Sequence, residues 1–179
     1  MKSPRMPDWR VWPSPARLRL ALLIAFTASL VIFATLQIHD RALSPDTIVS
    51  LELAFTPERA DTLLKAWGPG GVALARESLW IDFAFMPAYA FAFAGLVLSA
   101  ARAATGGRQQ LGFRLLAAPF AAWAYDLTEN LALLRVLANP VAPAAAPLLL
   151  AGIVASLKFA LLLACLGYWL AVLVSRRQA

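Results

Sequence analysis

Cysteine, histidine and charged residues are scarce in this chain, and each scarcity excludes a class of site. The single cysteine, Cys165, excludes an intrachain disulfide and a zinc site built from several cysteines. The single histidine, His39, excludes an HExxH motif, a bis-histidine haem and a histidine-rich metal site. The sequence also has no P-loop, no GxSxG elbow, no CxxC pair and no dinucleotide-binding fingerprint. We therefore predict no metal site and leave the cofactor unknown. Oxygen atoms, one lysine and aromatic rings must hold most of any ligand.

The low content of charge points to a membrane protein. Only 15% of the residues are charged, whereas 61% are hydrophobic, and the mean hydropathy is +0.69. In ordinary soluble domains the apolar share is nearer one half. The formal net charge of +6 does not indicate nucleic-acid binding, because membrane proteins concentrate Lys and Arg in their cytoplasmic loops. We predict an all-α polytopic membrane protein with membrane lipids as partners and no nucleic acid.

Four apolar runs are long enough to cross a bilayer, which takes about 20 residues. The predicted spans are residues 18–38, 78–101, 111–137 and 148–174. The first follows a basic segment, as in a signal peptide, but it is too long for such a segment and has no small-residue cleavage site, so we expect it to be uncleaved. These runs predict a transmembrane four-helix bundle that forms a single membrane domain over residues 1–179.

The distribution of basic residues predicts the orientation. The side that holds both termini carries ten Lys and Arg residues against one acid, and the opposite loops carry five against six acids. Basic residues are enriched in cytoplasmic loops. The protein is therefore predicted to lie in the bacterial inner membrane with both termini in the cytoplasm.

The outer loop, predicted over residues 39–77, contains a short amphipathic helix. Thr56-Pro57-Glu58 is typical of a helix start, the apolar positions that follow have helical spacing, and Gly68-Pro69-Gly70-Gly71 is expected to end the helix. We expect this extracytoplasmic helix to lie on the membrane surface or to cap the bundle, with a soluble protein partner as the alternative. Residues 48–55 fit a helix and a strand equally, so their conformation stays open.

Polar residues inside the predicted spans suggest a binding site. A carboxylate at the centre of a spanning helix costs about 2.5–3.5 kcal/mol, so such groups usually face the bundle interior. At about 1.5 Å of rise per residue, those of three spans fall in the outer half of the membrane. We expect them to share one outward-facing pocket. The candidate ligand-binding residues are Asp82, Tyr89, Trp123, Asp126, Glu129, Asn130 and Lys158.

The charges of this predicted pocket do not balance, since three carboxylates face one lysine. Unpaired charge is costly in such a medium. The compensation could come from protons, from Arg76 or Arg135 at the rim, from a bound cation, or from a cationic ligand. Glu52, in the outer loop, could lie over the mouth of the pocket.

Short motifs resemble a family of uncharacterised bacterial four-helix membrane proteins. They are Asp82-x6-Tyr89, Asp126-x2-Glu129-Asn130 and the segment Leu51-Glu52-Leu53, and the resemblance covers about residues 47–137. It implies a fold and a polar cluster, and no reaction.

Several functions remain open at this stage. The first is a binding protein that holds a lipid-like or cationic ligand, with Asp82, Asp126 and Glu129 as anionic anchors and Lys158 as internal counter-ion. The second is a membrane-embedded enzyme acting on a lipid or isoprenoid substrate, with Asp126 and Glu129 as acid/base pair and Tyr89 assisting. A proton-coupled carrier and a purely structural cluster complete the set. The sequence leaves the oligomeric state undecided.

Overall fold

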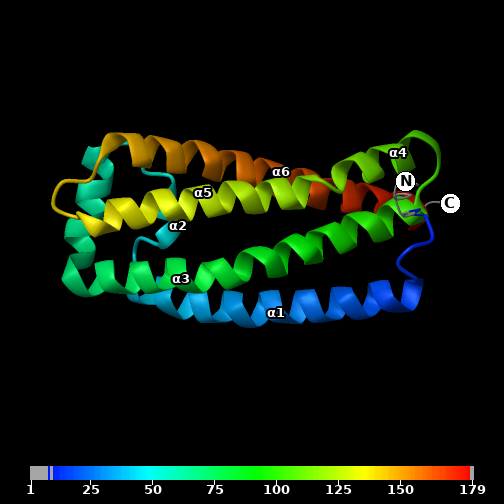
Figure 1. Cartoon of the computed structure of the whole chain (residues 1–179), viewed down its shortest axis with the longest axis horizontal. Coiled ribbons are helices and arrows are strands. Elements are labelled where there is room, and N and C mark those ends of the chain that lie inside the picture. Colours follow the sequence, from blue (N-terminus) through cyan, green and yellow to red (C-terminus); the bar gives the residue numbers. More distant parts are fainter. Residues whose placement is uncertain (1–7, 9, 178–179) are drawn as a thin grey trace, which may run out of the picture.

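The computed structural model describes residue 8 and residues 10–177, and in this part of the chain it contains only helices, turns and loops (Figure 1). The helices are α1 (Pro15–Ala42), α2 (Ile48–Glu52), α3 (Pro57–Ala103), α4 (Gly106–Leu115), α5 (Ala118–Ala138) and α6 (Ala145–Arg177). Four of them are long and pack as a bundle. The predicted all-α bundle is thereby confirmed.

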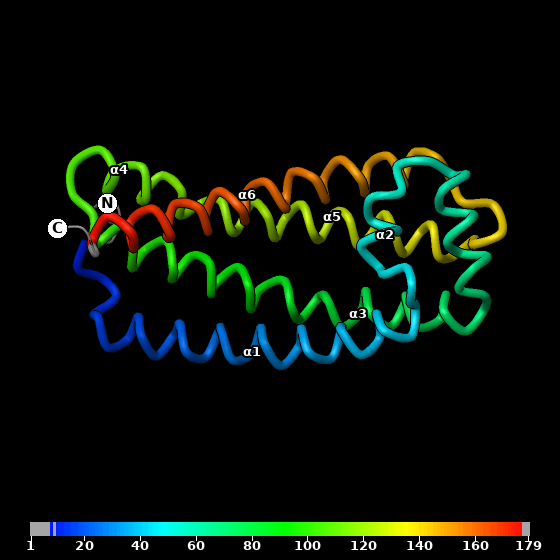
Figure 2. The backbone as a smooth tube through the Cα atoms, turned by 180° about the vertical axis from the view of Figure 1, so that it is seen from behind, coloured from blue at the N-terminus to red at the C-terminus, as the bar shows by residue number. Residues whose placement is uncertain are grey.

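The bundle has a core of three helices and one outer helix. Helices α3, α5 and α6 all pack against one another, whereas α1 packs mainly on α3 (Figures 1 and 2). The start of α1 and the end of α6 lie at the same end of the bundle, which we call the terminal end (Figure 1). The opposite end is covered by residues 43–67, which we call the cap. They comprise α2, its flanking loops and the first part of α3 (Figures 1 and 2).

Three helices, α1, α3 and α6, are long and apolar enough to cross a membrane. Helix α5 has 21 residues and carries the three charged residues Asp126, Glu129 and Arg135, and it is not among these three helices. It nevertheless follows α6 closely and returns the chain from the terminal end to the cap (Figure 1). Since α3 and α6 both run from the cap to the terminal end, α5 provides the return path between them (Figure 1).

The boundaries differ from the predicted spans at two bends. The first part of α3 ends at Gly68 as expected, because Gly68 has φ +62° and ψ −176°, a conformation that favours glycine. The helix then resumes at Pro69, so residues 69–77 are helical and the helix that contains the predicted span 78–101 begins before that span. The predicted span 111–137 is likewise divided between α4 and α5. Pro119 explains this bend, since it lacks a backbone N–H and suits the first turn of a helix.

Hydrogen bonds at helix ends fix the cap. Asp40 at the end of α1 accepts a hydrogen bond from the backbone N–H of Ile48 (3.1 Å), and residues 48–52 are helical, which settles their open conformation. The Thr56 side chain accepts from the N–H of Arg59 (3.4 Å), which confirms the predicted helix start. His39, at the first position of the predicted outer loop, lies within α1, and its Nδ1 is 3.1 Å from Ser78 Oγ of α3.

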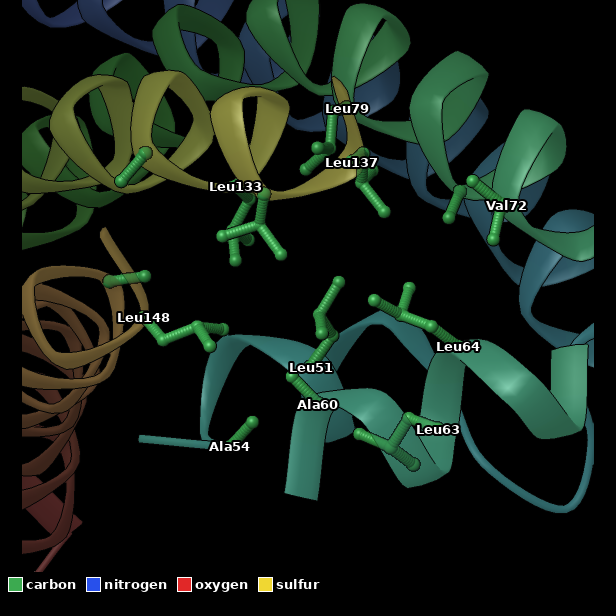
Figure 3. Packing of buried hydrophobic residues seen from close by; sticks show 14 of the residues in the cluster. Leu51, Ala54, Ala60, Leu63, Leu64, Val72, Leu79, Leu133, Leu137 and Leu148 are labelled. Carbon is green, nitrogen blue, oxygen red and sulfur yellow. The ribbon is translucent and has the colours of Figure 1, made fainter. Parts of the chain in front are cut away.

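Apolar packing holds the cap on the bundle. Leu51 of α2 is completely buried in a cluster to which Leu79, Leu133 and Leu148 contribute from the three core helices (Figure 3). Burying one leucine side chain contributes about 1.5–3 kcal/mol. Phe55 lies against Gly152 of α6, where an added Cβ would come within 2.5 Å of the phenyl ring. The cap is therefore docked on α6 as well as on α3 and α5.

Candidate functional site

Lys158 of α6 is the centre of a buried cluster of carboxylates. Its Nζ lies 2.8 Å from Asp126 Oδ1, 2.8 Å from Glu129 Oε2 and 3.7 Å from Glu52 Oε2. All four side chains are buried, and Glu129 has no solvent exposure at all. Asp126 and Glu129 are three residues apart on α5 and so share one face of that helix. The α2 carboxylate of Glu52 comes down onto this face from the cap.

Asp126 is the fully paired acid of the cluster. One of its oxygens accepts a hydrogen bond from Lys158 Nζ (2.8 Å). The other accepts from the Tyr89 hydroxyl of α3 (2.8 Å), and Tyr89 is itself buried. Hydrogen bonds to a charged partner are about twice as strong as neutral ones. Asp126 therefore ties α5 to both α3 and α6.

Glu129 is the least satisfied acid of the cluster. It makes an ion pair with Lys158, but neither of its oxygens has a hydrogen-bond donor in suitable geometry within the described part of the chain. The large majority of buried polar side-chain atoms have such a partner. The carboxylate of Glu129 thus retains capacity for a donor or a proton.

A second polar contact lies next to this cluster, between α3 and α5. Asn130 Nδ2 donates to Asp82 Oδ2 (2.8 Å) and to the backbone oxygen of Leu79 (3.3 Å). Asp82 is half-buried, and among the described residues it forms no ion pair with Lys158. The sequence therefore predicted correctly that Asp82 lies near the other polar residues. Its direct hydrogen-bond partner is the side-chain amide of Asn130.

Apolar layers enclose the cluster on both sides. Towards the terminal end lies a layer of Met86, Tyr89, Ala90 and Ala122, with Trp123 packed against it. Towards the cap lies the leucine cluster of Figure 3. All seven candidate residues thus occupy one region between α3, α5 and α6. In this closed arrangement their charged groups are packed against protein, and a ligand would need the cap to move.

Glu52 is the site residue that sequence reasoning left outside the candidate set. The sequence feature that could have identified Glu52 is its position as a single acid between the apolar residues Leu51 and Leu53. Burial raises the pKa of Glu52 above its ordinary value of 4.5, and the Lys158 charge opposes this shift. With Glu52 included, three carboxylates contact one lysine.

The arginines proposed as compensating charges lie elsewhere. Arg76 donates to the backbone oxygen of Leu137 (2.7 Å), at the C-terminus of α5, and Arg135 is exposed. Within the described residues no group of three or more acids, histidines or cysteines is arranged to hold a metal ion. Protons on the carboxylates, a bound cation and a cationic ligand stay open as sources of positive charge.

Comparison of the chain with protein-family models, curated proteins and solved structures finds no match.

Proposed function

We propose that the chain is a multi-pass inner-membrane protein, with both termini in the cytoplasm, that binds the cationic head group of a lipid-like ligand at the Lys158 cluster. The observation that carries this proposal is the carboxylate of Glu129, which is completely buried, pairs with Lys158 through Oε2, and has no hydrogen-bond donor for Oε1 among the described residues. An ammonium group would supply both the missing donor and the missing positive charge.

The distances assign different roles to the acids. Asp126 is the internal counter-ion of Lys158, since both its oxygens are already occupied. Glu129 and Glu52 are the anchors for the ligand, because one lysine cannot neutralise both of them as well as Asp126. Asp82 is a secondary anchor held in place by Asn130.

Access to the site requires movement of the cap. Glu52 makes the longest of the three contacts to Lys158, 3.7 Å against 2.8 Å for the two acids of α5. It also belongs to a five-residue helix between two loops. Displacement of α2 would expose Glu129 and Lys158 towards the outer side while leaving the Asp126 pair intact. The apolar layers on either side suit a ligand with a hydrocarbon part.

A second function, a membrane-embedded enzyme acting on a lipid or isoprenoid substrate, is favoured by the continuous contacts from Tyr89 through Asp126 and Lys158 to Glu129. In that case Glu129 would be the general acid or base, and the paired Asp126 would position Lys158. We also propose membership of the group of uncharacterised bacterial four-helix membrane proteins, on the Asp82/Tyr89 and Asp126/Glu129/Asn130 motifs.

Native mass spectrometry of the detergent-purified protein tests the proposed function. Wild type is expected to retain a cationic amphiphile that the Glu129→Gln variant loses. Glu77→Gln, which changes an exposed glutamate of α3, is the matched control and should retain it. The same ligand on wild type and on a folded Glu129→Gln variant would contradict the proposal.

A further inference from the structure

A second feature of the fold, an apolar groove, lies at the terminal end and is separate from the Lys158 cluster. It has a volume of about 990 Å³ and lies between α1, α3 and the junction of α4 with α5. No residue of the Lys158 cluster lines it. Its volume is at the upper end of the roughly 300–1,000 Å³ found for small-molecule sites.

Small residues facing one another hollow out this groove. Helix α1 contributes Ala21 and Ala28, and α3 contributes Ala88 and Ala94. The two helices touch where Leu22 packs on Gly95, since an added Cβ there would come within 2.5 Å of the Leu22 side chain. On the other side α1 has no large contact with α5 or α6. The groove is therefore an opening between α1 and the rest of the bundle.

The dimensions of the groove suit one hydrocarbon chain. Its lining on α1 extends from Leu18 to Ile32, which corresponds to about 21 Å along a helix. One leaflet of the hydrocarbon core is about 15 Å deep. Phe91, Phe113 and Phe120 add aromatic walls. An acyl chain that starts at the terminal end can thus be accommodated over its length.

Exposed basic residues stand next to several lining residues in the sequence. Arg10, Arg17 and Arg114 are exposed, and they lie within two residues in sequence of the lining residues Trp12, Leu18 and Phe113. Arg102 donates to the backbone oxygen of Pro13 (2.8 Å), which fixes the segment before α1 at this position. Asp8, whose side chain accepts from the N–H of Arg10, is the one acid of this segment among the described residues. Basic residues near an anionic membrane surface are attracted to it.

We infer that the groove binds one acyl chain of an anionic glycerophospholipid, whose phosphate lies among Arg10, Arg17 and Arg114. Charge complementarity selects this occupant, because the apolar lining accepts any lipid chain while the exposed arginines favour an anionic head group over a zwitterionic one. This site is independent of the Lys158 cluster, so either can fail without the other.

The quenching of Trp12 fluorescence by brominated lipids tests the inference. The full chain is reconstituted in phosphatidylcholine vesicles that contain a minor fraction of either phosphatidylglycerol or phosphatidylcholine brominated near the head group. The Trp12 signal is the difference between wild type and Trp12→Phe. We expect several-fold stronger quenching by brominated phosphatidylglycerol. Equal quenching by the two lipids would overturn the inference.

Two variants separate the head-group site from the chain site. Arg17→Gln combined with Arg114→Gln, which changes exposed side chains, should make quenching by the two lipids equal. Ala21→Phe should fill the groove and reduce quenching by both lipids. Ala34→Phe, at an exposed position of α1 that does not line the groove, should leave the wild-type preference intact. A preference for phosphatidylglycerol that survives the double arginine variant would contradict the inference, even if Ala21→Phe fails to fold.

Discussion

Glu129 Oε2 lies 2.8 Å from Lys158 Nζ in an ion pair without hydrogen-bond geometry, and Oε1 of this completely buried carboxylate has no donor among the described residues. Asp126, three residues earlier on α5, receives donors on both oxygens. Two acids on one helix face therefore differ sharply in how far the protein satisfies them. Under the proposed function, the ligand therefore interacts with Glu129 and not with Asp126.

Removal of the lysine alone should destabilise the protein more than removal of the lysine together with the charges of its two α5 partners. Lys158→Met leaves three buried carboxylates without their common partner, and breaking a buried ion pair in this way costs about 3–5 kcal/mol. Adding Asp126→Asn and Glu129→Gln to Lys158→Met should recover part of this loss. Thermal unfolding of the variants in one detergent checks the order. A triple variant less stable than Lys158→Met would contradict this account of the cluster.

The hydroxyl of Tyr89 should matter for stability, whereas that of Tyr125 should not. Tyr89→Phe removes the donor to Asp126 Oδ2 and leaves a buried acceptor unsatisfied, at a cost of about 1–3 kcal/mol. Tyr125→Phe on α5 is the control, since this half-buried hydroxyl has no hydrogen bond in the structure. Equal unfolding temperatures for the two variants would show that the Tyr89 bond contributes nothing.

A methyl group at Gly152 should loosen the cap. Gly152→Ala places a Cβ within 2.5 Å of the Phe55 ring, whereas at Gly167 of the same helix an added Cβ meets nothing within 4 Å. We expect faster hydrogen exchange in residues 48–56 for Gly152→Ala and wild-type exchange for Gly167→Ala. Phe55→Ala should relieve the clash when combined with Gly152→Ala. Unchanged exchange in Gly152→Ala would mean that the cap is not held by this contact.

The cap should weaken as the pH rises. Burial raises the pKa of Glu52 above 4.5, so the folded protein binds more protons than the unfolded chain between 4.5 and the raised value. Its contribution to stability is therefore fully present below pH 4.5 and is lost as the pH rises through that interval. Lys158, Asp126 and Glu129 face the same carboxyl group, so the relevant quantity is the difference between wild type and Glu52→Gln.

Hydrogen exchange of residues 48–52 over this pH range measures that difference. Wild type should exchange faster at higher pH, after correction for the intrinsic rate, and Glu52→Gln should depend less on pH. An identical dependence in both proteins would assign the effect to the other acids.

The sequence predicted best those features that depend on large free energies of transfer into the membrane. Apolar runs long enough to cross a bilayer predicted the four long helices, and the cost of polar groups in such runs predicted that Asp126, Glu129 and Lys158 lie together inside the bundle. The position of Glu52 depends on how Leu51 docks among leucines from three other helices, which no local pattern encodes. The resumption of α3 at Pro69 was missed because Gly68-Pro69-Gly70-Gly71 is typical of a helix end, while helix packing sustains the next segment.

The different roles of Asp126 and Glu129 were beyond sequence reasoning for another reason. Both acids have the same helical face and the same lysine. They differ in the geometry of the Lys158 contact and in the Tyr89 hydroxyl, whose direction depends on how α3 packs against α5. Such distinctions depend on side-chain positions to within a few tenths of an ångström, which a sequence does not specify.

The most direct test of the central claim compares amphiphiles that differ only in their head group. The unfolding temperature of the purified protein is measured with dodecylamine, dodecanol and dodecanoate, for wild type, Glu129→Gln and the control Glu77→Gln. A buried carboxylate without a donor predicts that dodecylamine stabilises wild type and Glu77→Gln more than the other two compounds do, and that Glu129→Gln loses this preference. Equal stabilisation by all three head groups, or a preference for the amine that persists in Glu129→Gln, would contradict the claim that the Lys158 cluster binds a cationic head group.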